Sequence, residues 1–298
     1  MQKTDVPDTP QAPDEATDRS ALRLLRAHWK SIVIFLVGLA IVLYPLATQL
    51  YYSTDAEERV TDFEEGRSEL DQEVIDQRID LARAYNESLD PSRISDPYSK
   101  RAREGRAEYA RMLEVHEMLG HVEIPKIGQD LPMYAGTSDE VLQRGIGHME
   151  GTSLPVGGAG THSVLTAHRG LPSARLFTDL DKMEVDDVFL VHNIDGPMAY
   201  KVDQITIVEP SDFSDVLVVE GQDYVTLLTC TPYMINSHRL LVRGHRVELS
   251  EYAGSAEQAP IIPWDLALAL GLGAVVVVVG IIFVRRGRSR KRGSRRAA

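Results

Sequence analysis

The chain contains one cysteine, Cys230, which stands at the end of the apolar run YVTLLTC. The run predicts a β-strand whose alternate side chains share one face, and the Thr231-Pro232 pair that follows should end it. A thiol at a strand end can attack a carbonyl carbon only as the thiolate, and an ordinary thiol has a pKa of ~8.5. Cys230 is therefore either a nucleophile with a helping neighbour or a small buried side chain.

Nine histidines could supply the helping base. His168 is the best candidate, because it ends the run THSVLTAH as Cys230 ends YVTLLTC, and a loop, HRGLPSARLF, follows it. Strand ends are where a barrel presents side chains to a substrate. The remaining histidines are read as hydrogen-bonded core or surface residues: His28, His116, His121, His148, His162, His192, His238 and His245.

An arginine could support the charge that acyl transfer builds on a carbonyl oxygen. Arg239 and Arg243 share one face of the predicted strand HRLLVRGHRV, and Arg246 falls on the other. Arg239 is the nearest to Cys230 along the chain, across the turn TPYMINSH. A solvated strand arginine remains the alternative, and spacing alone hardly separates Arg239 from Arg243.

Short apolar or alternating runs with turns between them must position these residues. Such a texture predicts an all-β barrel or sandwich of roughly 130 residues, with a glycine-rich turn, RGIGHMEG, around His148. Before it, helical spacing is expected over 55–89 and 101–119, separated by the proline-containing stretch DPSRISDPYSK. The expected strands lie at 121–127, 132–134, 162–168, 188–194, 198–208, 224–230 and 239–249.

Two apolar runs near the chain ends predict membrane spans. Residues 31–54 carry no charge, and 266–284 hold 19 uncharged residues, enough for a hydrocarbon core of ~30 Å. Basic residues precede the first run and eight follow the second, in a chain whose net charge is −12. The positive-inside rule then predicts that both termini are cytoplasmic and the middle is outside. A cleaved signal peptide is the alternative for the first run.

The blocks TLLTCTPYMINSHRLLVRG and TAHRGLPSARLF, in the order His, Cys, Arg, resemble the sortases, specifically the class C, pilin-polymerising group. The likeness runs from about His121 to Leu249 and implies a sortase-type closed β-barrel. It also implies that His168 is the general acid/base, Cys230 the nucleophile and Arg239 the oxyanion support. Upstream, Asp96-Pro97-Tyr98 matches the group's lid motif, which covers the active site in relatives. Without the resemblance this motif reads as a plain turn.

The resemblance implies a membrane-anchored cysteine transpeptidase. It would cleave an LPxTG-like sorting signal between Thr and Gly through a thioester on Cys230, and transfer the acyl group to a pilin lysine. The alternatives are a sortase that anchors surface proteins to peptidoglycan, a hydrolytic cysteine protease, and a non-catalytic pilin-binding module. The expected partners are pilin subunits and the membrane, not nucleic acid, and the catalytic domain should be a monomer. No spacing of His and Cys fits a metal motif, so we expect neither metal nor cofactor.

The predicted organisation has seven parts along the chain. They are a disordered cytoplasmic segment (1–30), a first span (31–51), a helical region with the lid (52–120), the catalytic barrel (121–250), a linker (251–263), a second span (264–284) and a basic cytoplasmic tail (285–298).

Overall fold

Eight strands form a closed barrel in the computed structural model, which describes residues 15–89, 94, 96–98, 108–255, 271 and 273. The order around the barrel is β1-β2-β3-β4-β7-β8-β6-β5, which confirms the predicted mainly β fold with short helices. The strands are β1 (Gly120–Ile124), β2 (Gln129–Ala135), β3 (Ile146–His148), β4 (Thr161–Thr166), β5 (Val188–Asn193), β6 (Gly196–Val208), β7 (Asp223–Thr231) and β8 (His238–Val247). The helices are α1 (Glu15–Ser68), α2 (Gln72–Glu87), η3 (Glu108–Met112), η4 (Pro125–Ile127), α3 (Asp139–Arg144), η5 (Leu180–Lys182), η6 (Ser214–Val216) and α4 (Leu249–Ser255).

The central strands β4, β7 and β8 have two distinct faces. β4 runs parallel to β7, and β7 runs antiparallel to β8. Leu165, Leu227 and Val242 lie in register and are fully buried in the main core, so they fill the barrel. The alternate positions point outward, because side chains along a strand alternate between faces. The outward face of β7 carries Leu228 and Cys230.

Strand β3 replaces the glycine-rich turn expected around His148. Gly147 pairs with both Tyr134 of β2 and Thr166 of β4. A side chain on Gly147 would come within 2.4 Å of the Gly136 carbonyl oxygen, so only glycine allows this close pairing. Gly147 is one of the glycines from which a turn was predicted, and it is the residue that allows the chain to pair as a strand here.

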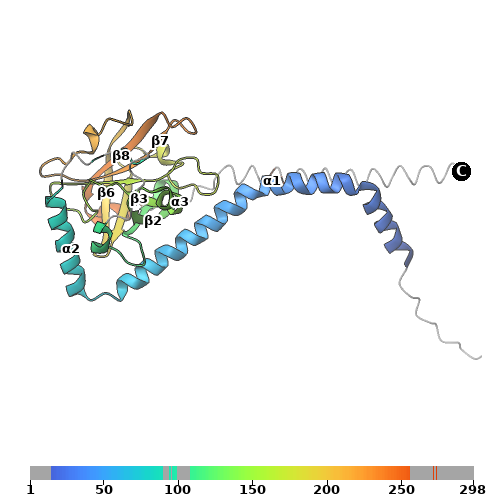
Figure 1. Cartoon of the computed structure of the whole chain (residues 1–298), viewed down its shortest axis with the longest axis horizontal. Coiled ribbons are helices and arrows are strands. Elements are labelled where there is room, and N and C mark those ends of the chain that lie inside the picture. Colours follow the sequence, from blue (N-terminus) through green and yellow to red (C-terminus); the bar gives the residue numbers. More distant parts are fainter. Residues whose placement is uncertain are drawn as a thin grey trace, which may run out of the picture. The chain divides into compact units, whose positions relative to one another are not determined.

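The helical region before the barrel is shorter and more broken than predicted. The stretch 55–89 is split, because α1 ends at Ser68 and α2 begins after the N-cap Asp71. Ile75, Ile79 and Ala82 of α2 belong to the main core, and each large apolar side chain buried there contributes about 1.5–3 kcal/mol. Figure 1 shows α2 beside the barrel.

The prediction of a helix at 101–119 is wrong for residues 108–119, the part of this stretch that the structure describes. Residues 101–107 lie outside the described residues, and beyond them the chain forms only η3 and a bridge between Val115 and Met118. The expected linker begins instead as helix α4, while residues 256–263 lie outside the described part.

The first predicted membrane span, 31–51, lies within α1, and the second, 264–284, lies outside the described residues except for Gly271 and Gly273. Over the described part of the chain, no helix combines the length and apolar character needed to cross a membrane.

Candidate active site

Cys230 lies between two other candidate residues at one end of β7. The antiparallel register of β7 and β8 sets Cys230 directly opposite Arg239, so both side chains point out of the barrel on the same face. Both are buried, with 6% of Cys230 and 7% of Arg239 exposed. Arg243 is two outward positions further along β8 and is bound to Asp203 by two hydrogen bonds of 2.9 and 3.2 Å. The structure therefore puts Arg239, and not Arg243, next to the thiol.

His168 approaches Cys230 from the opposite side, through β4. The parallel register pairs Thr166 with Leu228, and the Ala167 amide donates to the Leu228 carbonyl at 3.3 Å. Continued by two residues past the end of β4, the same register brings His168 level with Cys230. The Phe177 amide donates to the His168 carbonyl at 3.2 Å and fixes the chain just beyond the strand.

The segment Asp96-Pro97-Tyr98 covers this end of the sheet. Asp96 accepts two hydrogen bonds of 2.9 Å from the Arg239 guanidinium, one from Nε and one from Nη2. The Tyr98 ring lies 5.6 Å from the His168 ring, between centroids, and 5.0 Å from the Arg239 guanidinium carbon. Its hydroxyl donates to the Ala167 carbonyl at 2.7 Å, and Pro97 is buried. All six residues singled out in the sequence thus meet at one place.

The groups around Cys230 shift the pKa of its thiol in opposite directions. Burial is the largest effect and raises the pKa of the Cys230 thiol. The positive charge of Arg239 lowers that pKa, Asp96 raises it, and a hydrogen bond with Tyr98 lowers it. The net result is a raised pKa, because burial outweighs the effect of Arg239, and the carboxylate of Asp96 offsets part of that effect. Burial also raises the pKa of Tyr98, which keeps its hydroxyl protonated as a donor.

An apolar floor continues from Cys230 along the outer face of the barrel. It consists of the buried residues Met149, Val164, Val216, Leu228 and Leu241. Ile94 and Tyr98, from the segment before the barrel, pack against it. The floor is thus an apolar surface beside the thiol that the chain's own upstream segment covers.

Arg169 is a site residue that sequence reasoning missed. Its guanidinium donates from Nη1 to the Thr231 hydroxyl at 3.0 Å and from Nε to the Thr178 carbonyl at 3.2 Å, and Nη2 lies 2.6 Å from Asp181. Its side chain is only 9% exposed. Arg169 follows His168 and Thr231 follows Cys230, so this contact ties the two strand ends together. Its place directly after His168 was the available signal, but its burial could not be read from the sequence.

Comparison with known proteins agrees with this architecture. The Sortase domain family matches residues 122–247. Sortase A of Bacillus anthracis is 25% identical over 172 residues, which cover 57% of this chain and 77% of that protein. Sortase C-1 of Streptococcus pneumoniae has a solved structure that is 60% identical, with a TM-score of 0.62, covering 64% of this chain and 98% of that one. The pilus-related sortase C of Group B Streptococcus is 56% identical, with a TM-score of 0.62, covering 63% of this chain and 97% of that one.

A closed eight-stranded barrel with a lone thiol at a strand end, at this level of identity to solved sortases, defines a cysteine transpeptidase. The chain belongs to the sortase family, and within it to the class C sortases.

Proposed function

We propose that this protein polymerises pilin subunits, with Cys230 as nucleophile, His168 as general acid/base and Arg239 as oxyanion support. The observation that carries the proposal is the position of Cys230 on β7. The register of β8 sets Arg239 on one side of it, and the register of β4, continued past its end, sets His168 on the other. Nucleophile, proton donor and positive charge on one face are what acyl transfer through a thioester requires.

In the first half-reaction, the Cys230 thiolate attacks the carbonyl carbon of Thr in an LPxTG-like sorting signal. Arg239 supports the negative oxygen of the tetrahedral intermediate. The bond from Thr to Gly then breaks, and His168 gives its proton to the leaving glycine amine. The product is a thioester between Cys230 and the pilin.

In the second half-reaction, the amine of a lysine on the next pilin subunit attacks the thioester carbon. His168 takes the proton from that amine, the bond between carbon and sulfur breaks, and Cys230 leaves as the thiolate. The new bond is an isopeptide between two subunits. An acceptor bound nearby makes this step effectively intramolecular.

Asp96, Pro97 and Tyr98 act as a lid in this proposal. The carboxylate of Asp96 accepts hydrogen bonds from Nε and Nη2 of Arg239, and the Tyr98 ring lies against Arg239 and His168. Pro97 restricts the backbone between them. The lid must move before a sorting signal can reach Cys230.

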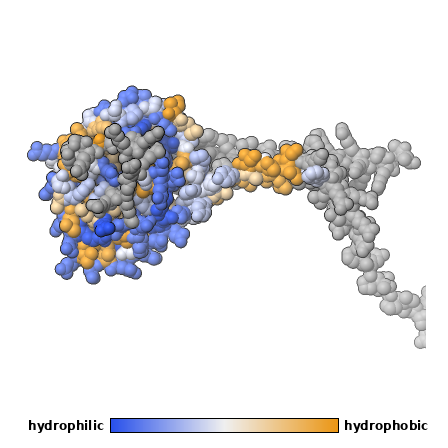
Figure 2. All heavy atoms as spheres, in the orientation of Figure 1, coloured by the Kyte–Doolittle hydropathy of each residue, from blue (hydrophilic) through white to orange (hydrophobic). Residues whose placement is uncertain are grey.

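The proposed enzyme is anchored in the cell membrane by two spans, 31–51 and 264–284, with both termini in the cytoplasm and the catalytic domain outside. Within 33–51 of α1, apolar side chains stand exposed, including Ile34 at 73% and Ile41 at 68%. Figure 2 shows the apolar surface of this stretch. Side chains of this kind suit the hydrocarbon interior. Confinement of enzyme and pilin to one surface raises their effective concentration.

The test incubates the full-length protein, in detergent, with a pilin that carries an LPxTG signal and a second pilin that offers the acceptor lysine. Intact-mass and peptide mass spectrometry would look for a thioester on Cys230 and an isopeptide bond between subunits. Asp96→Ala/Tyr98→Ala is run beside the parent so that a closed lid cannot hide activity.

Cys230→Ala should abolish both products, while Arg243→Ala, on the same face but bound to Asp203, should retain them. A thioester that passes only to a peptidoglycan amine would make the protein a wall-anchoring sortase. A thioester that passes only to water would make it a hydrolase. Failure of the lid variant to form any adduct would leave a non-catalytic pilin-binding module.

A further inference from the structure

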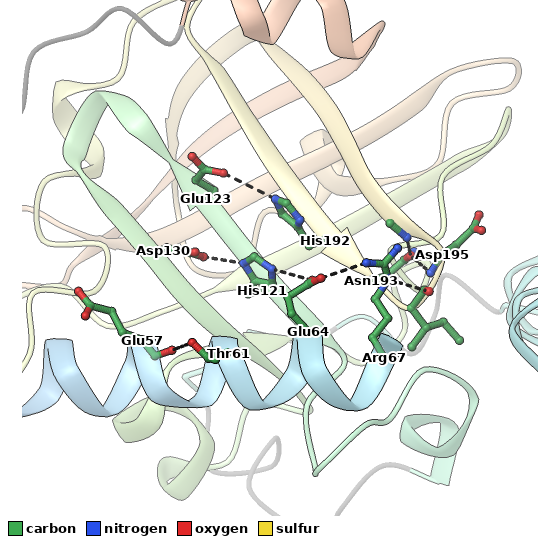
Figure 3. A network of polar contacts seen from close by, with 12 residues as sticks. Glu57, Thr61, Glu64, Arg67, His121, Glu123, Asp130, His192, Asn193 and Asp195 are labelled. Carbon is green, nitrogen blue, oxygen red and sulfur yellow. Dashed lines mark hydrogen bonds and ion pairs between the residues drawn. The ribbon is translucent and has the colours of Figure 1, made fainter. Parts of the chain in front are cut away.

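Two histidines lie side by side on the outer face of the barrel, away from the candidate active site. His121 of β1 pairs directly with His192 of β5, and their rings stack with centroids 4.0 Å apart. Figure 3 shows that helix α1 crosses this face and brings Glu64 to the histidines. A ligand atom of Glu64 and a ring nitrogen of each histidine all lie within 4.8 Å of one another.

The surroundings of this His–Glu cluster (Glu64, His121 and His192) are rich in negative charge. The Nδ1 atom of His121 lies 2.6 Å from Asp130, and its Nε2 atom lies 3.3 Å from Glu64. A neutral imidazole carries one hydrogen, so it can donate to only one of two carboxylates. The second contact brings a lone pair against a carboxylate oxygen unless a cation stands between them. The cluster therefore calls for a positive charge, either a second proton or a metal ion.

His192 also has a ring nitrogen that a nearby cation would stabilise. Its Nε2 atom is shielded from solvent and, within the described part of the chain, finds no hydrogen-bond partner. The nearest carboxylate oxygen, on Glu123, is 3.7 Å away. This long contact leaves a buried ring nitrogen without a full hydrogen bond, and a bound cation would relieve that cost.

Each of the other two cluster residues, His121 and Glu64, is also held in place by a neighbouring residue outside the cluster. Asp130 holds His121 through Nδ1, which directs Nε2 toward Glu64. Arg67 binds the second oxygen of Glu64 at 3.0 Å, which directs the first toward His121. Metal-binding histidines are oriented in this way, with the second ring nitrogen bonded to a carboxylate. The separation of 3.3 Å also matches two corners of a tetrahedron around an ion with bonds of ~2.0–2.1 Å.

We infer that Glu64, His121 and His192 form a binding site for a divalent transition metal of the Zn²⁺ class. Two imidazoles and one carboxylate suit Zn²⁺ and its neighbours, whereas Mg²⁺ and Ca²⁺ prefer oxygen donors. In this structure the two rings are stacked, so the ring of His192, 17% exposed, turns toward the ion when it binds. This site departs from the sequence-based expectation of no metal, because its ligands lie far apart along the chain.

The bound ion would fasten α1 to the barrel. Glu64 belongs to α1, and the two histidines belong to β1 and β5, so one ion would cross-link three elements. Phe63, fully buried beside His121, already packs this helix onto the barrel. The ion is structural in this role and takes no part in the transpeptidation.

The test measures Zn²⁺ binding by calorimetry on the full-length protein in detergent, with any purification tag removed and Cys230→Ala as the parent. That background is needed because the Cys230 thiolate could itself bind Zn²⁺. The parent should bind one Zn²⁺ per chain with micromolar or tighter affinity, and should not bind Ca²⁺ in the same range. Its melting temperature should rise with Zn²⁺ concentration.

Variants separate this site from adventitious binding. His121→Ala and Glu64→Gln should weaken Zn²⁺ binding at least 100-fold, and Asp130→Asn, which removes no ligand, about 10–100-fold. His245→Ala, a half-exposed histidine on β8 outside the cluster, should bind as the parent does. Glu64→Gln leaves the barrel strands unchanged, so circular dichroism can verify its fold.

Equal binding by the parent and by Glu64→Gln would overturn the inference. It would also be overturned by a parent that shows neither a heat of Zn²⁺ binding nor a change of melting temperature with Zn²⁺ concentration.

Discussion

At the scale of single residues, the surroundings of Cys230 favour the protonated thiol. The pKa of Cys230 is raised by burial first, and the carboxylate of Asp96 adds to this effect. Arg239 could stabilise a thiolate, but two of its nitrogens are bound to Asp96. Asp96 therefore adds to the raised pKa of the thiol and also binds the guanidinium that lowers it.

We expect Asp96→Asn to shift the pH midpoint of Cys230 alkylation by iodoacetamide to lower pH. Removing the carboxylate removes a charge that raises the thiol pKa, and it frees Arg239 to face the sulfur. A lower pKa gives more thiolate at a fixed pH, and one pH unit corresponds to about tenfold. The alkylation rate at pH 7, measured by intact mass, should therefore rise, about tenfold for each pH unit by which the midpoint falls.

The matched control is Asp203→Asn, which breaks the equivalent carboxylate pair with Arg243 on the same face. Its alkylation profile should follow that of the unmodified protein. An Asp96→Asn profile that also follows it would show that Asp96 does not set the charge state of Cys230.

Arg169 is the second residue whose effect can be isolated. Arg169→Ala removes the contact from the His168 segment to Thr231, so the separation of His168 and Cys230 is no longer fixed. A misplacement of about 1 Å can cost 100-fold, so we expect kcat to fall roughly 10–100-fold with the KM for the sorting signal little changed. Steady-state transpeptidation kinetics, with and without added guanidinium, measure both effects.

Added guanidinium should restore part of the kcat of Arg169→Ala, which a general loss of folding would not permit. Arg175→Ala serves as the control, because Arg175 lies in the same loop and pairs with Asp179. A fall in kcat of the same size in both variants would remove the special role of Arg169.

At the scale of elements, the short strand β3 is held by a buried side chain as well as by its pairing with β2 and β4. β3 has only three residues, and its His148 is fully buried. The Nδ1 atom of His148 lies 3.0 Å from the Tyr109 hydroxyl, and Nε2 lies 2.8 Å from the Ser153 carbonyl. One imidazole thus joins η3, β3 and the loop after β3.

This element should be the acid-sensitive part of the fold. Burial lowers the pKa of His148 from 6.5 to about 4, so the unfolded chain takes up a proton first as the pH falls. The stability that His148 contributes is complete above about pH 6.5 and is lost as the pH falls toward 4. Between pH 7 and pH 5 the loss from this residue is about 2 kcal/mol.

Urea unfolding of the protein at pH 7 and pH 5 measures this loss. His148→Gln should show a smaller difference between the two pH values than the parent. His238→Gln, which changes a half-exposed histidine, should retain the parent's difference. Equal differences in all three proteins would contradict the assignment to His148.

At the scale of the whole molecule, the proposed topology puts the catalytic barrel and the basic tail on opposite sides of a membrane. In a Cys230→Ala background, an added thiol at exposed Glu220 should react with a membrane-impermeant maleimide on intact cells. An added thiol at Ser294, in the tail, should react only after the cells are opened. Labelling of Ser294→Cys on intact cells would contradict the two-span topology.

The sequence by itself, through its strand patterns and its resemblance to the sortases, determined the fold class and the candidate residues of the active site. Alternating strands ending at His168 and Cys230, and an arginine at the start of the next strand, are local patterns that the chain order preserves. The closed barrel and the meeting of Asp96, Tyr98, His168, Cys230 and Arg239 agree with what the resemblance to the sortases implies. The local patterns alone left a sandwich open, hardly separated Arg239 from Arg243, and predicted a plain turn at Asp96-Pro97-Tyr98.

Only the tertiary structure decided the rest, because it depends on contacts between distant segments. From the sequence, the glycines around His148 predict a turn. The chain forms strand β3 there instead, because Gly147 lets it pair closely with β2. The hydrogen bond from Arg169 to Thr231 joins residues 62 positions apart in the sequence, and the contact between Glu64 and His121 joins residues 57 positions apart. The hydrophobic periodicity of the sequence does not predict such contacts, since they form only when the strands close into a barrel and a helix packs against it.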